Sequence, residues 1–299
     1  MPDGVPNKPS PGGRGLGEGR QPEQTRPISA HLKPNPTNNP LAKRSQTLFS
    51  LFGYYLHWFF WRKFRSVRVS RSGLPRAPAG RPLIIYCNHP SWWDPALLIL
   101  LSHKLLPARP GYGPMDQAAL GQYGVLERMG IFGIALDTPR GAAQFLETSL
   151  QVLSNPTNIL WITAEGHFTD PRLRPVRLRP GIAHLARRIP GAIILPLALE
   201  YTFWNESRPE ALAYFGEPID TGPAFSDNDR TTAEWTAHLE TELTRTMDAL
   251  AAQSAQRNPA LFRPLVRGGA GIGGIYDLWR RLRAWTAGRR FDPTHEGQE

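Results

Sequence analysis

Short apolar runs alternate with stretches of helical character from about residue 67 onward, and this alternation limits the possible folds most strongly. Three runs rich in β-branched and aliphatic residues predict buried strands: Arg81–Asn88, Asn158–Thr163 and Ala192–Glu200. Strands that alternate with helices form layered α/β domains, in which helices flank a sheet. We therefore expect one layered α/β domain over residues 67–258, with helices flanking a sheet.

The stretches between these runs predict helices and further strands. Asp94–Leu106 begins with the pair Asp94-Pro95, which is typical of an N-cap followed by the first helical residue. Helices are also expected over Gln117–Met129, Arg140–Leu153, Pro180–Arg188 and Thr232–Gln253, a strand over Ala108–Met115, and a strand or loop over Gly130–Leu136.

The composition restricts the class of protein. The 299 residues include 35 Lys+Arg and 25 Asp+Glu, a net charge of +10, and 40% are hydrophobic, which excludes global disorder. A pI near 10.2 indicates an anionic partner: nucleic acid, a membrane surface or a phosphorylated substrate. The single cysteine, Cys87, excludes an intrachain disulfide and a cysteine-based zinc site.

The N-terminal region changes character near residue 43. Residues 1–43 are rich in Pro, Gly, Asn and Arg and almost free of aromatic side chains. Such a segment buries too little apolar surface to offset the entropy of ordering it, so we expect a disordered tail. It also lacks the apolar core of a signal peptide, and we expect the chain to begin in the cytoplasm.

Residues 44–66 predict a helix that lies in the membrane interface. The segment is too short and too aromatic for a membrane span, and its basic C-terminal end suits anionic headgroups at the cytoplasmic face, as in a peripheral, monotopic protein. The alternative is a helix that caps the core. The apolar residues are Leu48, Phe49, Leu51, Phe52, Tyr54, Tyr55, Leu56, Trp58, Phe59, Phe60 and Trp61, followed by Arg62, Lys63 and Arg65.

A second amphipathic segment lies in the C-terminal extension, residues 259–299. Helical spacing places Ile275, Leu278, Leu282 and Trp285 on one face, flanked by basic residues at 280, 281 and 283. This pattern predicts another basic helix at a membrane interface, with a domain-capping helix as the alternative.

The strongest candidate for catalysis is the block Asn88-His89-Pro90-Ser91-Trp92-Trp93-Asp94, which follows a predicted strand. A strand-to-helix turn brings His89 and Asp94, five residues apart, within reach of each other. A carboxylate on one imidazole nitrogen fixes the tautomer and leaves the other nitrogen free as a base. The alternative is that Asp94 only caps its helix and His89 only packs.

Other chemistry has weaker support in the sequence. His89 and Asp94 have no further ligand at regular spacing, so we expect no metal. Cys87 lies in the predicted strand, and its two-residue offset from His89 gives no support for a thiol nucleophile. No Gly-rich phosphate loop and no G-x-S-x-G elbow are present, so we expect neither ATP use nor a serine hydrolase.

Four blocks in order resemble the motifs of the glycerolipid acyltransferases, of the lysophosphatidate acyltransferase type. His89-x4-Asp94 is similar to the first motif, Gly130–Asp137 to the second, Thr163–Gly166 to the third, and Ile193–Leu197 to the fourth. The resemblance covers about residues 45–220.

The resemblance implies a role for each matching residue. His89 would be the general base for the acceptor hydroxyl, and Asp94 would orient it. The backbone around Gly166 is a candidate donor to the oxyanion, and Glu165 resembles the acceptor-site glutamate, with a turn anchor as its alternative. Acyl-CoA or acyl-carrier protein would supply the acyl group as co-substrate, without another cofactor.

Two departures from the family pattern concern the phosphate of the acceptor. Thr138 stands where the second motif has an arginine, and His167-Phe168 replaces the usual Thr-Arg of the third. Arg140, two residues beyond Thr138, is our candidate for the missing cation, because Arg favours phosphates. The alternatives are Arg172, Arg174, Arg177 and Arg179, or a solvated basic loop facing headgroups.

These observations predict an enzyme similar to 1-acylglycerol-3-phosphate O-acyltransferase, which acylates a lysophosphatidate or lysophospholipid in membrane lipid synthesis. An acceptor without phosphate, such as a glycosylated lipid or an aminolipid, is the alternative. A basic membrane- or nucleic-acid-binding protein without catalysis would leave the His-x4-Asp block unexplained, so we expect no nucleic-acid partner.

Overall fold

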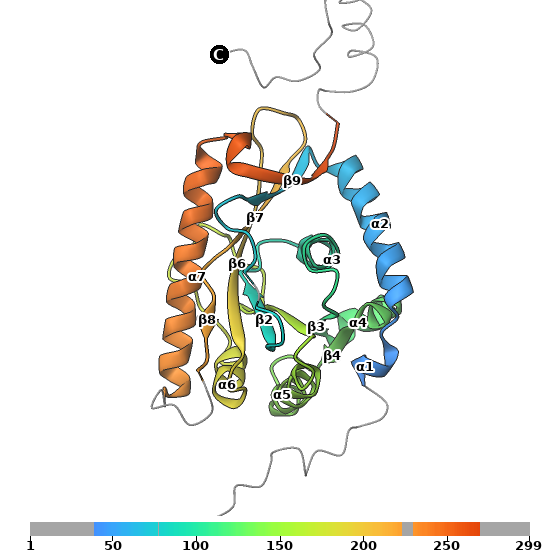
Figure 1. Ribbon diagram of the computed structural model, residues 1–299, viewed down its shortest axis with the longest axis vertical. Helices are drawn as coiled ribbons and strands as arrows, with labels where there is room; N and C mark the ends of the chain where they lie inside the picture. Colours follow the sequence, from blue (N-terminus) through green and yellow to red (C-terminus); the bar gives the residue numbers. More distant parts are fainter. Residues whose placement is uncertain (1–38, 77, 223–229, 270–299) are drawn as a thin grey trace, which may run out of the picture. The chain divides into compact units, whose positions relative to one another are not determined.

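A computed structural model describes residues 39–76, 78–222 and 230–269. In this part of the chain, a nine-stranded sheet lies between two layers of helices (Figure 1), which confirms the predicted α/β fold. One face of the sheet is covered by α5 (Pro139–Leu153), α6 (Gly181–Arg188) and α7 (Thr232–Ala255). The other face carries α2 (Gln46–Lys63) and α3 (Asp94–Leu105).

The sheet has the order β4-β3-β5-β2-β6-β7-β1-β9, and β8 pairs with β6. The strands from β4 to β6 in this order are all parallel, so their carboxyl ends meet at one edge. The strands are β1 (Ser66–Ser70), β2 (Leu83–Cys87), β3 (Gly111–Asp116), β4 (Ile131–Ile134), β5 (Ile159–Thr163), β6 (Ile193–Thr202), β7 (Glu210–Phe215), β8 (Ile219–Asp220) and β9 (Phe262–Arg267).

The central strand β2 is buried on both faces, which explains its continuous apolar run. Ile84 and Tyr86 belong to the core beneath α5, α6 and α7, while Ile85 and Cys87 belong to the core beneath α2 and α3. Strands covered by helices on both sides need apolar side chains at every position. The same reasoning holds for β5 and for the first part of β6.

Two predicted helix boundaries were wrong. Asp94 is the first residue of α3 and not its N-cap; Trp93 takes the cap position without a side-chain hydrogen bond. The helix predicted over Gln117–Met129 is broken into α4 (Gln117–Gln122) and a 3-10 helix (Gly124–Met129). The break falls beside Gly124, whose backbone freedom disfavours a continuous helix.

The terminal regions differ in part from the prediction. Pro40–Lys43 form a short helix, α1, capped by Asn39, so the expected disorder is wrong for these residues. Residues 1–38 lie outside the described part of the chain. In the C-terminal extension, β9 pairs with β1, and the basic helix predicted around Trp285 lies outside the described residues.

Helix α2 packs against the core on one side and exposes apolar side chains on the other, so it has features of both alternatives considered from its sequence. Phe49, Leu56 and Phe60 are buried, in the same core as α3. The opposite side remains apolar and exposed, with Tyr54 65% exposed and Trp58 50% exposed. No helix of the described residues is long and apolar enough to cross a membrane.

Candidate active site

His89 and Asp94 form a direct hydrogen bond at the carboxyl end of β2. His89 lies two residues beyond the strand, Asp94 begins α3, and 2.6 Å separates Nδ1 of His89 from Oδ2 of Asp94. Asp94 is fully buried, whereas the His89 side chain is 15% exposed. Because the carboxylate accepts from Nδ1, the neutral imidazole keeps its free lone pair at Nε2, where a substrate proton can be taken.

Tyr201 completes the surroundings of Asp94, and the sequence analysis missed it. Its hydroxyl donates to Oδ1 of Asp94 over 2.7 Å, while the N–H of Ser91 donates to Oδ2 over 3.1 Å. Burial raises the pKa of the Tyr201 phenol well above its ordinary value, so it remains a donor. Tyr201 reaches Asp94 because β6 continues beyond Leu197, the partner of Cys87 at the end of β2, and Tyr201 lies four residues past Leu197 on this extension.

Asn88 and Glu165 hold the turn that carries His89. The Asn88 amide donates to the carbonyl of Leu199 over 2.9 Å and accepts from its N–H over 2.8 Å. Glu165 accepts the His89 N–H at Oε2 over 2.6 Å, and burial raises the pKa of this carboxyl. Glu165 therefore stands as an anchor of the turn, the alternative considered from the sequence.

Gly166 adopts the left-handed conformation, with φ +73°, which favours glycine. Its N–H donates to the Thr163 carbonyl over 3.1 Å, so this N–H is engaged in the turn and is not free for an oxyanion. A Cβ at this position would also overlap Nε of Arg179. Gly166 thus allows the Arg179 guanidinium to lie against the third motif, where it also donates to Asp137 over 2.8 Å.

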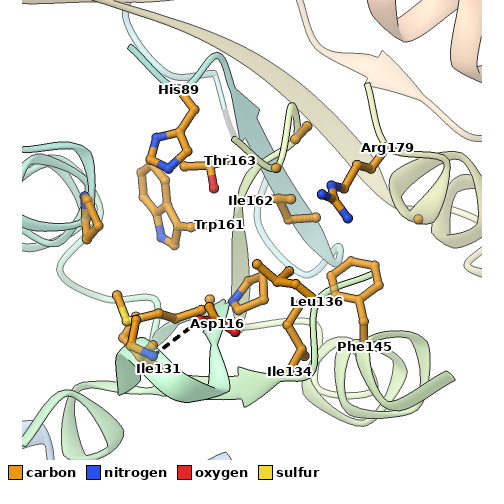
Figure 2. Close-up of a pocket in the computed structure, with 18 of the residues that line it drawn as sticks. His89, Asp116, Ile131, Ile134, Leu136, Phe145, Trp161, Ile162, Thr163 and Arg179 are labelled. Atoms are coloured by element: carbon orange, nitrogen blue, oxygen red, sulfur yellow. Dashed lines mark hydrogen bonds between the residues drawn. The ribbon is translucent and has the colours of Figure 1, made fainter. Parts of the chain in front are cut away.

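A cavity of about 1080 Å³ borders this site and is lined from both helix layers. Its lining is mostly apolar and comes from α2, α3, α5 and α6, from β3, β4 and β5, and from the loops that follow β4 and β5. In Figure 2, His89 lies at one end above Trp161, Arg179 lies on the opposite wall, and Asp116 and Ile131 lie at the far end. This size and lining suit a long apolar ligand.

The arginines considered for binding the acceptor phosphate differ in whether they line this cavity. Arg140 is exposed and is not among the lining residues, although its neighbours Pro139 and Gly141 are. Of the five arginines considered, Arg179 alone lines the cavity. Three of the others form ion pairs elsewhere: Arg172 with Asp170, Arg174 with Asp248, and Arg177 with Glu240.

Two further side chains beside His89 have defined surroundings. The Phe168 ring lies 4.5 Å from the His89 ring between centroids and is 59% exposed, so it partly covers the imidazole from solvent. Burial raises the pKa of the Cys87 thiol well above its ordinary value. An activated cysteine nucleophile needs a lowered pKa, so we assign Cys87 a role in core packing and not in catalysis.

An imidazole–carboxylate pair thus borders an apolar cavity at the carboxyl ends of parallel strands, the edge of the sheet at which α/β domains bind their ligands. Residues 68–200 match the family model described as Acyltransferase.

Among solved structures, the chain is similar to the 1-acyl-sn-glycerophosphate (LPA) acyltransferase PlsC from Thermotoga maritima. The two share 16% identity over 69% of this chain and 80% of that one, with a TM-score of 0.48. No curated protein matches the chain.

Proposed function

We propose that this enzyme transfers a fatty acyl group from the thioester of acyl-CoA or acyl-carrier protein to a hydroxyl of lysophosphatidate or another lysophospholipid, in membrane lipid synthesis. The observation that carries the proposal is the His89–Asp94 pair at the border of the apolar cavity. The direct test incubates the protein with an acyl thioester and lysophosphatidate and measures diacylated product against free fatty acid, which separates transfer from hydrolysis.

The reaction follows from the tautomer of His89. Nε2 takes the proton of the acceptor hydroxyl as its oxygen attacks the thioester carbonyl, and Asp94 stabilises the imidazolium that forms. The tetrahedral intermediate then collapses, the carbon–sulfur bond breaks, and the thiolate leaves with the proton from Nε2. An ester and a free thiol are the products, and His89 returns to its neutral form.

The oxyanion of the intermediate needs preorganised donors. Because the N–H of Gly166 is engaged in the turn, we assign this role to the following N–H groups, those of His167 and Phe168. Neither donates a hydrogen bond to another described residue, and both residues line the cavity.

Arg179 is our candidate for binding the phosphate of the acceptor. Arginine has five N–H donors in a planar fork, and one of them is held by Asp137, which leaves donors for a phosphate oxygen. Asp137 fixes the direction of the guanidinium beside Gly166. Arg179 would thus replace both arginines that the family motifs carry and this chain lacks.

Arg179→Gln is expected to raise the KM for lysophosphatidate about 10- to 100-fold, with little change in the KM for the acyl donor. One charge-assisted hydrogen-bond pair contributes about 1.5–3 kcal/mol, which corresponds to this range. Steady-state kinetics with each substrate varied in turn provide the measurement. Arg140→Gln is the matched control, and we expect it to behave as the wild type.

The opposite pattern, with a raised KM in Arg140→Gln alone, would return the phosphate site to the position first considered. If the wild-type enzyme ignores lysophosphatidate and uses a glycosylated lipid or an aminolipid, the acceptor carries no phosphate and both arginines lose this role.

The exposed side of α2 is our candidate for the membrane-binding surface. The double variant Tyr54→Ser/Trp58→Ser is expected to bind anionic vesicles at least about tenfold more weakly, because both rings are about half exposed or more and are the kind that sit at headgroup level. Vesicle sedimentation measures the binding, and an unchanged melting temperature shows that the fold is intact. Equal binding of variant and wild type would assign the membrane contact to another surface.

A further inference from the structure

Two polar atoms in the apolar cavity have no hydrogen-bond partner in the described part of the chain. They are Oγ of Ser102, on α3, and Nε1 of Trp161, on β5. Both residues line the cavity, and both are nearly buried, with 2% and 7% of their surface exposed. A buried donor without a partner destabilises a protein, so such atoms in a ligand cavity point to a polar group of the ligand.

The two atoms lie close together beside Gly111. A Cβ added to this glycine would lie 2.9 Å from Ser102 Oγ and 3.0 Å from Trp161 Nε1. The two atoms are therefore no farther apart than the sum of these distances, which allows one ligand oxygen to bind both. A side chain at this position would crowd both polar atoms, and Gly111 itself lines the cavity.

The location distinguishes this pair from similar atoms elsewhere. Ser149 Oγ and Trp204 Nε1 are also buried without a partner among the described residues, but neither residue lines the cavity. Ser102 and Trp161 thus combine an unused hydrogen-bonding capacity with a place in the wall of the cavity.

On the basis of the acyl transfer proposed above, we propose that Ser102 and Trp161 recognise a hydroxyl group within the acyl chain of the donor. The indole N–H donates only, whereas the serine hydroxyl both donates and accepts. A hydroxyl oxygen on the chain accepts from Trp161 and donates to Ser102, so both protein atoms and the ligand group are satisfied. The rest of the chain contacts the apolar lining.

The strand register gives the depth of this site. Thr163 on β5 pairs with Cys87 at the end of β2; Trp161 lies two residues before this pair and His89 two residues after it. The two strand residues from Thr163 back to Trp161 correspond to about 7 Å along the sheet at roughly 3.3 Å per residue, and His89 lies in the turn beyond the strand end. Figure 2 shows Trp161 on the cavity side below His89. The recognised hydroxyl therefore lies in the interior of the chain and not beside the thioester.

The test measures kcat/KM for acyl thioesters of one chain length, either unsubstituted or carrying a hydroxyl at successive carbons. For the wild type we expect one interior position to be preferred about tenfold over the unsubstituted chain, a difference of 1.4 kcal/mol. The ratio should fall to about one in Ser102→Ala and Trp161→Phe, and in Gly111→Ala, whose methyl group fills the space. The matched controls Ser149→Ala and Trp204→Phe should keep the wild-type ratio.

A second measurement determines the affinity of the corresponding free hydroxylated and unsubstituted fatty acids by displacement of a fluorescent fatty acid, independently of transfer. The same preference and the same loss in the variants are expected. A wild type that transfers and binds both chains equally overturns the recognition of a hydroxyl but leaves acyl transfer intact. A preference that survives in Ser102→Ala and Trp161→Phe overturns the assignment to this pair. Absence of any transfer, with the binding preference present, contradicts the proposed function alone.

Discussion

His89→Ala is expected to lower kcat/KM for acyl transfer by about 10²–10⁴-fold while the protein remains folded. Loss of a general base typically has this effect, because the acceptor hydroxyl must then lose its proton to water. The fold should tolerate the change, since the His89 ring borders the cavity and contacts Phe168 at the surface. The turn itself is held by the neighbouring Asn88 amide and by the His89 N–H, which alanine retains.

Product formation and circular dichroism together check this result. His238→Ala is the matched control. His238 lies on α7, in the helix layer opposite α2 and α3, and we expect this variant to keep the wild-type rate. A folded His89→Ala protein with near-normal turnover would remove His89 from the mechanism and with it the general-base step.

Asp94→Asn is expected to have the second largest effect, a fall in kcat approaching about 10⁴-fold. In the Ser-His-Asp template the same exchange leaves the geometry intact but favours the wrong imidazole tautomer, with a loss of this size. Asp94 holds Nδ1 of His89 over 2.6 Å, so an amide that donates to Nδ1 would move the proton to Nε2 and block it as a base.

Comparison with Tyr201→Phe separates orientation from stability. The phenylalanine removes the 2.7 Å hydrogen bond to Oδ1 but keeps the carboxylate on His89, so we expect a smaller loss of rate, about 10-fold or more. The pH dependence of kcat and thermal unfolding are measured for both variants. An Asp94→Asn enzyme as fast as the wild type would reduce Asp94 to a structural residue of the turn.

Local sequence determined the central strands and the contact between His89 and Asp94. The runs that became β2, β5 and β6 are apolar at nearly every position, because helices cover them on both faces. His89 and Asp94 are five residues apart across one strand-to-helix turn, so their contact depends on local geometry alone. For this reason the spacing could indicate this contact, although it left open the alternative that Asp94 only caps its helix, and the resemblance of four blocks to one family favoured the pair.

The outer strands of the sheet could not be predicted in the same way. β1 and β7 place a charged pair inside the protein: Arg68 donates to Glu210 over 2.9 Å, and both side chains are nearly buried. Charged residues normally indicate an exposed segment, and only the pairing of the two strands makes this arrangement stable. The sequence contains no local sign of a partner 142 residues away.

The tertiary structure alone decided which distant residues surround His89. Parallel pairing puts the ends of β2 and β5 at one edge, which brings Glu165 to the His89 N–H across 76 residues of sequence. The extra length of β6 brings Tyr201 to Asp94 across 107 residues. Arg140 is close to the second motif in sequence but points to solvent, whereas Arg179 comes to the cavity because Gly166 leaves room for its guanidinium. Spacing along the chain indicates contacts within one strand-to-helix loop. Contacts between different loops depend on strand order and register, which are set only when the whole sheet packs.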